Sequence, residues 1–437
     1  MKHVLVGSFH SERWQRLLPI AFITYSFAYL DRSNYSLGAA GGLKHDLGIT
    51  AGAAGLLGGL FFLGYFFFQI PAAHYAEKRS VKRLMFWSLV LWGIFAAAQG
   101  IIPWLWLLMV DRFLLGVVEA AVIPAMLIFL VHWFSASERA RANTILILGN
   151  PITVLWMSVI SGYLIAATSW RWMFIIEGLP AIAWAFVFRA MVDDHPRDAA
   201  WLEREEKEAI ESALAEDQRG MPAMRGYWEA FRQKNVLILA VQYALWSIGV
   251  YGFVFWLPTI IKLGSHQGIG NTGALSAVPY ALAVILMIVA SHFSDESHRR
   301  KIFVWPLLAL GALAFYGSYL IGSHSFIGSY LLLILAAGTM YAPYGPYFAL
   351  ITDLLPQNVS GAAMALVNSF GALGGFVGAY AVGYLVGTPG GKGTAFIFMA
   401  CALAGSALLM LLVTRPHLRN LAGRVGARPV RPHARPN

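Results

Sequence analysis

Residues 17–38 read LLPIAFITYSFAYLDRSNYSLG, an apolar run long enough to cross a membrane that nevertheless contains Asp31 and Arg32. An ionised side chain at membrane depth costs roughly 2.5–3.5 kcal/mol on insertion scales. Such residues are rare in spans and usually mark a transport pathway or a binding site. Asp31 and Arg32 therefore indicate both that the chain crosses a membrane and that its first span has a task beyond packing.

The whole composition supports a membrane protein. The chain has 437 residues, of which 58% are hydrophobic and only 12% are charged. A helix of about 20 apolar residues crosses the hydrocarbon core, whereas the alternating pattern of a membrane β-barrel is absent. We predict an all-α integral membrane protein with twelve transmembrane helices, at about 17–38, 51–73, 85–102, 105–131, 143–167, 172–191, 235–262, 273–293, 303–322, 327–351, 361–387 and 394–414.

The formal net charge of +10 indicates topology and does not require a nucleic-acid partner. Almost all Lys and Arg residues lie in alternate connections between the runs, and only Lys44, Arg171, Lys262 and Lys392 lie in the other set. The positive-inside rule then predicts that both termini and the central loop are cytoplasmic. We expect a multi-pass protein of a bacterial inner membrane, with the lipid bilayer as its solvent and no cleavable signal peptide.

The longest polar interruption divides the chain into two halves. We predict an N-terminal six-helix bundle at 1–192, a cytoplasmic central loop at 193–234 with an amphipathic helix near 201–210, a C-terminal bundle at 235–414 and a basic tail at 415–437. The segment AAHYAEK at 72–78, after the second span, is similar to ASHFSDE at 290–296, after the eighth. Such a repeat is typical of transporters built from two pseudo-symmetric halves.

A second charged set, Asp111, Arg112 and Glu119, lies in the fourth run. Arg112 and Glu119 are seven residues apart and so share one face of a helix. Burial raises the pKa of a carboxyl group, whereas a neighbouring arginine lowers it. Arginine can also bind an anionic carboxylate with two hydrogen bonds. We therefore predict that Asp31 and Glu119 are proton-coupling residues and that they lie next to the arginines that bind an anionic substrate. The alternative is a buried charge network that only fastens two helices together.

Polar side chains within the spans are candidates for recognising a polyhydroxylated acid, although each alone also fits an interhelix hydrogen bond. The predicted substrate-binding residues are Tyr29, Arg32, Tyr65, Arg112, Asn150, Gln242, Tyr243, Asn368 and Ser369. The histidines have no metal-ligand spacing, the loops contain no catalytic set, and no glycine loop ends in Gly-Lys-Ser/Thr. We expect no metal, no cofactor, no ATP drive and no enzymatic activity.

The chain resembles the major facilitator superfamily over nearly its whole length and, within it, the anion:cation symporter family. The segments that carry the resemblance are YLDR at 29–32, RFLLG at 112–116 with Glu119-Ala120, ERARA at 138–142, WRWMFIIEG at 170–178 and FWLP at 255–258. More narrowly, FITYSFAYLDRSN at 22–34, FFLGYFFFQIPA at 61–72, GNPITVLWMS at 149–158, SIGVYGFVFWLP at 247–258 and MYAPYGPYFAL at 340–350 look like the 2-ketogluconate permease branch.

The resemblance implies proton-driven uptake of a sugar acid, with 2-keto-D-gluconate as the expected substrate and the monomer as the functional unit. By position, Asp31 and Glu119 match the proton-coupling acids, Arg32 matches the contact to the substrate carboxylate, and Arg112 matches the partner of the fourth-span acid. Tyr29, Tyr65, Gln242 and Asn368 fall on or near sugar-acid contacts. Asn150 stands where the galactonate branch has glutamine. The loop after the second span departs from the superfamily signature at Ala73, Glu77 and Ser80.

Three alternatives remain open at this point. The substrate could be another aldonate or hexuronate, such as gluconate, galactonate or glucuronate. The protein could instead exchange organic anions or export drugs. A membrane enzyme or a receptor would need a catalytic set or a signalling domain that the short connections do not contain.

Overall fold

A computed structural model describes residues 12–414 apart from 220–230, 298, 323 and 355–356, and in these ranges it contains helices and no strand. The predicted tail at 415–437 lies outside the described residues. The first part of the chain forms α1 (Glu12–Gly38), the π-helix η1 (Ala39–Leu43), α2 (Lys44–Asp46), α3 (Ala51–Lys78), α4 (Val81–Ala98), α5 (Leu105–Glu119), α6 (Val122–Trp133), α7 (Ala136–Ala167) and α8 (Trp170–Met191).

The remaining elements follow a connection that contains the 3₁₀-helix η2 (Pro196–Asp198) and α9 (Arg204–Arg219). They are α11 (Lys234–Ser265), α12 (Ile269–Ser297), η3 (Arg300–Phe303), α13 (Trp305–Gly322), α14 (Phe326–Tyr341), α15 (Tyr344–Leu354), α16 (Gln357–Val386) and α17 (Gly391–Leu412).

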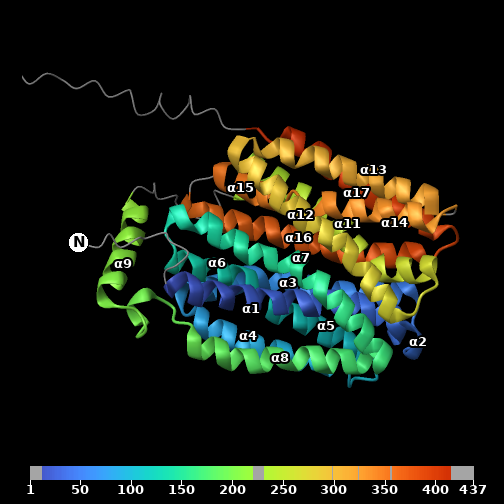
Figure 1. Ribbon diagram of the computed structural model, residues 1–437, viewed down its shortest axis with the longest axis horizontal. Helices are drawn as coiled ribbons and strands as arrows, with labels where there is room; N and C mark the ends of the chain where they lie inside the picture. Colours follow the sequence, from blue (N-terminus) through green and yellow to red (C-terminus); the bar gives the residue numbers. More distant parts are fainter. Residues whose placement is uncertain (1–11, 220–230, 298, 323, 355–356, 415–437) are drawn as a thin grey trace, which may run out of the picture.

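The helices have the lengths that a membrane requires. Eleven spans in the described ranges are long and apolar enough to cross a bilayer. The twelfth is α1, which has 27 residues and runs alongside the others, but whose hydropathy is lowered by its charged and polar side chains (Figure 1). The predicted all-α fold is confirmed. Large apolar side chains such as Leu313 and Ile327 are exposed on the outside, as expected where lipid replaces water.

Two spans are broken near their middle, at corresponding places in the two halves. In the fourth span, α5 ends at Glu119 and α6 begins at Val122; in the tenth, α14 ends at Tyr341 and α15 begins at Tyr344. A proline lies in the first turn of α6 and another directly precedes α15. Proline has no backbone N–H and its ring clashes with the carbonyl four residues earlier, which breaks a helix. The breaks leave Glu119 and Tyr341 buried at helix ends inside the bundle.

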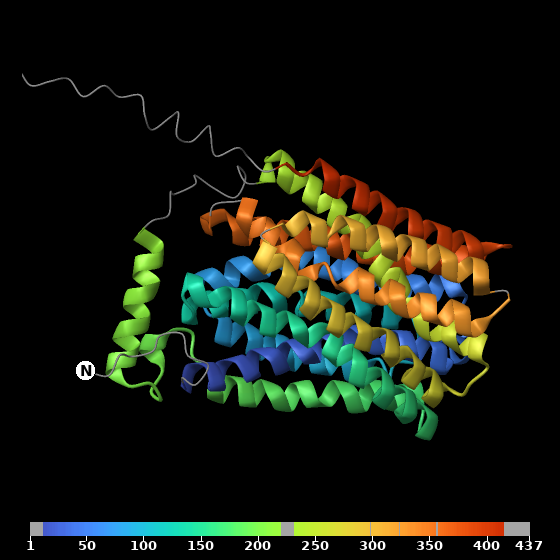
Figure 2. The ribbon, with the colours of Figure 1, turned by 45° about the horizontal axis from the view of Figure 1, so that its top comes forward.

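The long helices form two groups that lie side by side, as Figures 1 and 2 show. Helices α1–α8, coloured blue to green, make up one group, and α11–α17, coloured yellow to red, make up the other. Between the groups, α3 packs against α16, α7 packs against α12, and α1 packs against α11. Helix α9 lies across one end of the bundle and α2 lies at the opposite end (Figure 1). We call these the α9 end and the α2 end.

The two halves are in close contact at the α2 end because glycines lie where α7 meets α12 and where α3 meets α16. A Cβ atom at Gly273 would lie 2.3 Å from the Ser158 carbonyl oxygen, and one at Gly55 would lie 2.7 Å from the Ala379 carbonyl oxygen. Lys262 of α11 also donates a 2.8 Å hydrogen bond to a carbonyl group of η1. Small residues permit such close helix approach in lipid. The halves are therefore sealed against each other at this end.

At the α9 end, the segment after α8 is bonded to the start of α4 and to the end of α6. Asp194 accepts hydrogen bonds from the Ser80 hydroxyl (2.6 Å) and the Lys82 backbone N–H (2.8 Å), at the N-terminus of α4. Lys82 Nζ donates to the Asp193 carboxylate at 3.1 Å, and the Trp133 indole donates to the Asp193 carbonyl at 3.0 Å. Ser80, one of the departures from the signature, thus helps to cap α4.

A buried ion pair lies at the same end. Arg13 of α1 donates to the Glu138 carboxylate at 2.6 Å and to the Trp133 carbonyl at 2.7 Å. Glu138 also accepts from the Ser135 backbone N–H (3.0 Å) and hydroxyl (2.9 Å), which forms a capping box for α7. Burial alone would raise the pKa of Glu138, but the hydrogen bonds from Ser135 and the Arg13 guanidinium outweigh it and hold the pKa below the ordinary value.

Glu138→Gln is expected to destabilise the protein by about 3–5 kcal/mol at neutral pH, because it removes one partner of a buried pair. The unfolded chain binds the proton of Glu138 at higher pH than the folded protein does, so this stabilisation is lost as pH falls below the ordinary value of 4.5. Thermal unfolding in detergent at neutral and acidic pH measures the effect. Glu211→Gln, at an exposed position on α9, is the control. A difference between the Glu138→Gln variant and wild type that widens in acid would contradict the assignment.

Candidate substrate and proton site

Asp31 and Arg32 have separate partners because consecutive residues on a helix point about 100° apart. Arg32 faces α3 and α5, where it forms an ion pair with Glu119. Asp31 faces α4 and α8, where it accepts a hydrogen bond from the indole of Trp92. The two adjacent charges therefore do not neutralise each other, and each is available for a role of its own.

The guanidinium of Arg32 is surrounded by three aromatic rings. Its Nη2 donates to Glu119 Oε2 at 3.3 Å, and its guanidinium carbon lies 4.8 Å from the rings of both Tyr29 and Tyr65 and 5.1 Å from that of Phe61. Ring faces attract a cation, so these rings support the guanidinium without using its hydrogen-bond donors. In the described residues, Arg32 Nε and Glu119 Oε1 have no hydrogen-bond partner. Buried polar groups are almost always bonded, so both atoms are suited to a polar guest.

Asp31 belongs to a chain of hydrogen-bonded polar groups that joins α1, α7 and α8, and Trp92 links it to α4. Asn34, one turn further along α1, donates through Nδ2 to Asp31 Oδ1 at 3.4 Å and to Glu177 Oε2 of α8 at 3.0 Å. Ser161 of α7 donates to Glu177 Oε1 at 2.5 Å. All four side chains are buried. Asp31 is thus linked to a second carboxyl group, and no arginine takes part in these bonds.

Arg112 also lies next to the Phe61 ring. Its guanidinium carbon is 5.5 Å from that ring and 4.6 Å from the ring of Tyr35, and its Nη1 donates to Gln99 at 3.2 Å. Arg112 and Arg32 thus share the Phe61 ring, but the hydrogen bond to Glu119 comes from Arg32 and not from Arg112. Asp111, the neighbouring residue on α5, is also buried.

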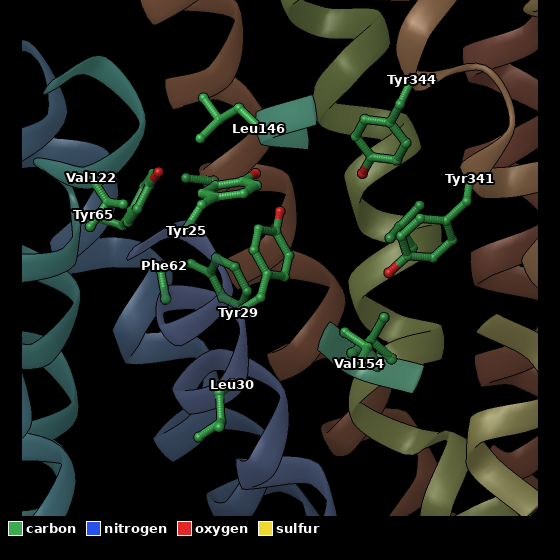
Figure 3. Close-up of a cluster of buried hydrophobic side chains, with 14 of the residues drawn as sticks. Tyr25, Tyr29, Leu30, Phe62, Tyr65, Val122, Leu146, Val154, Tyr341 and Tyr344 are labelled. Atoms are coloured by element: carbon green, nitrogen blue, oxygen red, sulfur yellow. The ribbon is translucent and has the colours of Figure 1, made fainter. Parts of the chain in front are cut away.

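Figure 3 shows Tyr25, Tyr29 and Tyr65 of the N-terminal half on one side and Tyr341 and Tyr344 of the C-terminal half on the other. The guanidinium of Arg32 lies over the rings of Tyr29 and Tyr65. Tyr25 and Tyr29 of α1 contact each other edge to face at 5.0 Å, and the phenol of Tyr29 is close enough to that of Tyr344 for electrostatic interaction. On the C-terminal side, Tyr243 of α11 stacks on Tyr347, with 5.4 Å between the ring centroids. The centroid of Tyr243 lies 6.3 Å from that of Tyr344. The two halves therefore meet at aromatic, hydroxyl-bearing surfaces next to the buried charges. We call these residues the tyrosine wall.

Of the other predicted residues, Asn150 has an unbonded acceptor in the described residues, whereas Gln242 and Ser369 form hydrogen bonds between helices. Asn150 of α7 is buried and its Oδ1 has no partner in the described residues. Gln242 of α11 donates to Ser406 of α17 at 2.8 Å, a bond within the C-terminal half. Ser369 of α16 donates across the halves to Gln69 of α3 at 2.7 Å, and its neighbour Asn368 is half-buried. The part of each residue in binding stays a prediction.

The structure adds residues that sequence reasoning did not select. They are Tyr25, Asn34, Gln69, Trp92, Glu177, Tyr341 and Tyr344. Glu177 carried a usable signal, because it is an ionisable residue inside a span, as Asp31 is. Asn34 and Tyr25 lie one turn from residues already selected. Gln69 likewise lies one turn from Tyr65 on α3, whereas Trp92 carried no signal, since nothing in the sequence shows that it faces this site.

A family profile described as "Major Facilitator Superfamily" matches residues 21–379. The chain belongs to this superfamily. A solved structure titled as the inward open conformation of the xylose transporter XylE from E. coli matches with a TM-score of 0.74 over 92% of this chain and 97% of that one, at 14% identity. This likeness supports the fold alone.

Among curated relatives, a putative tartrate transporter of Agrobacterium vitis is 30% identical over 92% of this chain and 90% of its own length. A quinolone resistance transporter of Acinetobacter baumannii is 29% identical over 91% and 93%. A probable galactarate/D-glucarate transporter of Escherichia coli, GudP, is 25% identical over 93% and 95%. The expected kinship with superfamily transporters of sugar acids and other organic anions is confirmed. The protein is a multi-pass membrane transporter and not an enzyme.

Proposed function

We propose that this superfamily member is a proton-coupled symporter that imports a sugar acid, 2-keto-D-gluconate, across a bacterial inner membrane by alternating access. Its termini would face the cytoplasm and the monomer would be the functional unit. One observation carries the proposal: a buried arginine rests on three aromatic rings against a single carboxylate at 3.3 Å, and its Nε has no hydrogen-bond partner among the described residues. That arginine can exchange Glu119 for the carboxylate of a substrate.

The exchange would couple the anion to a proton. A substrate carboxylate that binds Arg32 takes over the positive charge that stabilises ionised Glu119. Glu119 is fully buried, so without that charge it must bind a proton or remain as a costly isolated anion. The loaded site then contains one arginine–carboxylate pair and a neutral acid. Release of the anion returns Arg32 to Glu119 and expels the proton on the same side.

Alternating access would use the seal at the α2 end. The close contacts of Gly55 and Gly273 with the opposite half can form only while that end is shut. Parting of α3 from α16 and of α7 from α12 would open the site toward the α2 end. The tyrosine wall lies where the halves meet, with the ion pair beside it in the N-terminal half, and both would remain at the centre during this movement.

The tyrosine wall supports a cyclic sugar acid as the substrate. Phenol rings offer flat apolar faces for the C–H side of a pyranose and hydroxyl groups for its rim. 2-Keto-D-gluconate can close into such a ring, whereas tartrate cannot. Another aldonate or a hexuronate remains the alternative within this class, and the names of the tartrate and galactarate/glucarate transporters support an acidic, hydroxylated substrate.

A thermal-shift screen with purified protein tests the substrate class. We expect 2-keto-D-gluconate to raise the unfolding temperature more than gluconate, galactonate, glucuronate or tartrate does. Uptake in cells should increase with an inward proton gradient and collapse with a protonophore. If no sugar acid stabilises the protein, or if uptake ignores both the gradient and the protonophore, the proposal is wrong.

Drug export or anion exchange is the second candidate, and the relative named a quinolone resistance transporter favours considering it. An exchanger would show counterflow of labelled anion with no dependence on pH. A drug exporter would raise the resistance of expressing cells to quinolones. The symport proposal expects neither result.

A further inference from the structure

We propose that Glu177 is a third proton-carrying carboxyl group of this transporter, linked to Asp31 through the side-chain amide of Asn34. From the sequence alone, only Asp31 and Glu119 are predicted to carry protons. This inference rests on the proposed symport function and extends it to a residue on α8.

Asp31 and Glu177 share one hydrogen-bond donor, the side-chain amide of Asn34. Asn34 Nδ2 lies 3.4 Å from Asp31 Oδ1 and 3.0 Å from Glu177 Oε2, so one nitrogen faces two carboxyl groups. Asn34 itself is fully buried, and its Oδ1 has no partner in the described residues. An orphaned acceptor beside two acids is satisfied if the amide turns and a protonated carboxyl group donates to it. The cluster therefore fits two hydrogen-bond patterns that differ by one proton.

Glu177 is hydrogen-bonded to Asn34 and Ser161 and, in the described residues, to no cationic side chain. Helix α8 packs against α1, α4, α7 and η1. Toward Glu177, α1 presents Asn34 with Asp31 behind it, and α7 presents Ser161; α4 contributes Trp92, which bonds to Asp31. η1 has no polar side chain. The nearest arginine on α8 itself, Arg171, donates instead to backbone carbonyl groups of the α4–α5 connection.

The balance of buried charges supports the same assignment. Apart from the Arg13–Glu138 pair at the α9 end, the spans of the N-terminal half bury two arginines, Arg32 and Arg112, and four acids, which are Asp31, Asp111, Glu119 and Glu177. Four ionised acids would leave an excess of negative charge in a medium that stabilises ions poorly. Arg32 is paired with Glu119, and Arg112 lies close enough to Asp111, Glu119 and Asp31 to stabilise them. Protons on two of the four acids would balance the two arginines, and we assign one of these protons to Glu177, because its hydrogen bonds in the described residues come from Asn34 and Ser161 and not from an arginine.

Proteoliposomes test the proposal by measuring protons and substrate together. Glu177→Gln keeps the hydrogen-bond partners but cannot bind a proton, so the ratio of protons to anions should fall by about one per cycle. The thermal shift caused by the substrate should persist, because Arg32 is untouched. Glu138→Gln removes a different buried acid and should leave the ratio unchanged.

Infrared difference spectroscopy gives a readout that needs no transport. Addition of substrate to wild type should change a band from a protonated carboxyl group, and Glu177→Gln should lack that band. If Glu177→Gln does not fold, Ser161→Ala should shift the band, because it removes the hydroxyl at 2.5 Å from Glu177.

The outcomes separate this inference from the proposed function. Wild type that moves anions without protons would refute symport, and this inference with it. Proton-coupled wild type with an unchanged ratio in Glu177→Gln would overturn only the role of Glu177. A carboxyl band that neither Glu177→Gln nor Ser161→Ala alters would do the same.

Discussion

Arg32→Ala is expected to abolish the thermal shift caused by the substrate and to weaken binding by at least about 100-fold. The reason is the loss of charge-assisted hydrogen bonds, each of which contributes about 1.5–3 kcal/mol. Arg32 is the guanidinium that lies over Tyr29, Phe61 and Tyr65. Lysine has no planar fork, so Arg32→Lys should retain the charge but recover only part of the affinity.

Stability must be separated from binding in this experiment, because Arg32→Ala also leaves Glu119 without its ion-pair partner. Loss of one partner of a buried pair costs about 3–5 kcal/mol. The double variant Arg32→Ala/Glu119→Gln removes both charges and should regain much of that stability, yet it should still fail to bind. A double variant that binds the acid normally would show that Arg32 does not anchor the substrate.

Glu119→Gln is expected to abolish accumulation of substrate against a gradient while exchange of labelled for unlabelled substrate continues. Glutamine retains an acceptor for Arg32 but cannot bind a proton, so substrate binding is uncoupled from proton movement. Asp31→Asn should have the same effect, because Asp31 is the second predicted coupling acid and is buried beside Trp92. Uptake against a gradient, compared with counterflow in the same vesicles, measures the difference.

Gln99 supplies a matched control for these variants. It is a buried polar residue of the same half that is hydrogen-bonded to Arg112, and it has no proton to exchange. Gln99→Leu should lower stability without separating accumulation from exchange. Normal accumulation by both Glu119→Gln and Asp31→Asn would show that protons are carried elsewhere.

The fold was predictable because the membrane imposes length and hydropathy on every span. The one helix whose hydropathy falls short, α1, was still recognised, because Asp31 and Arg32 interrupt a run that is otherwise apolar. In the loop where an amphipathic helix is predicted near 201–210, the structure has the helix α9, which begins at Arg204. Gly55 of α3 and Gly375 of α16 lie at the contact of these two helices, where small residues permit close approach.

The partners within the site were less predictable. Spacing on α5 placed Arg112 and Glu119 on one face, but Arg32 of another helix forms the ion pair with Glu119. Which of two arginines reaches an acid depends on how helices pack, and a single sequence does not contain that information. Gln242 was chosen as a polar residue in a span, and its amide bonds to α17. The choice between a substrate contact and an interhelix bond likewise depends on helix rotation.

The most direct test of the central claim, that an anion and a proton share the site at Arg32 and Glu119, is the internal pH of proteoliposomes during downhill entry of 2-keto-D-gluconate. No pH gradient or membrane potential is imposed, and a pH-sensitive dye is trapped inside. The account predicts that the lumen acidifies as the anion enters, and that vesicles containing Arg32→Ala show no change. Entry of the anion at an unchanged internal pH would contradict it.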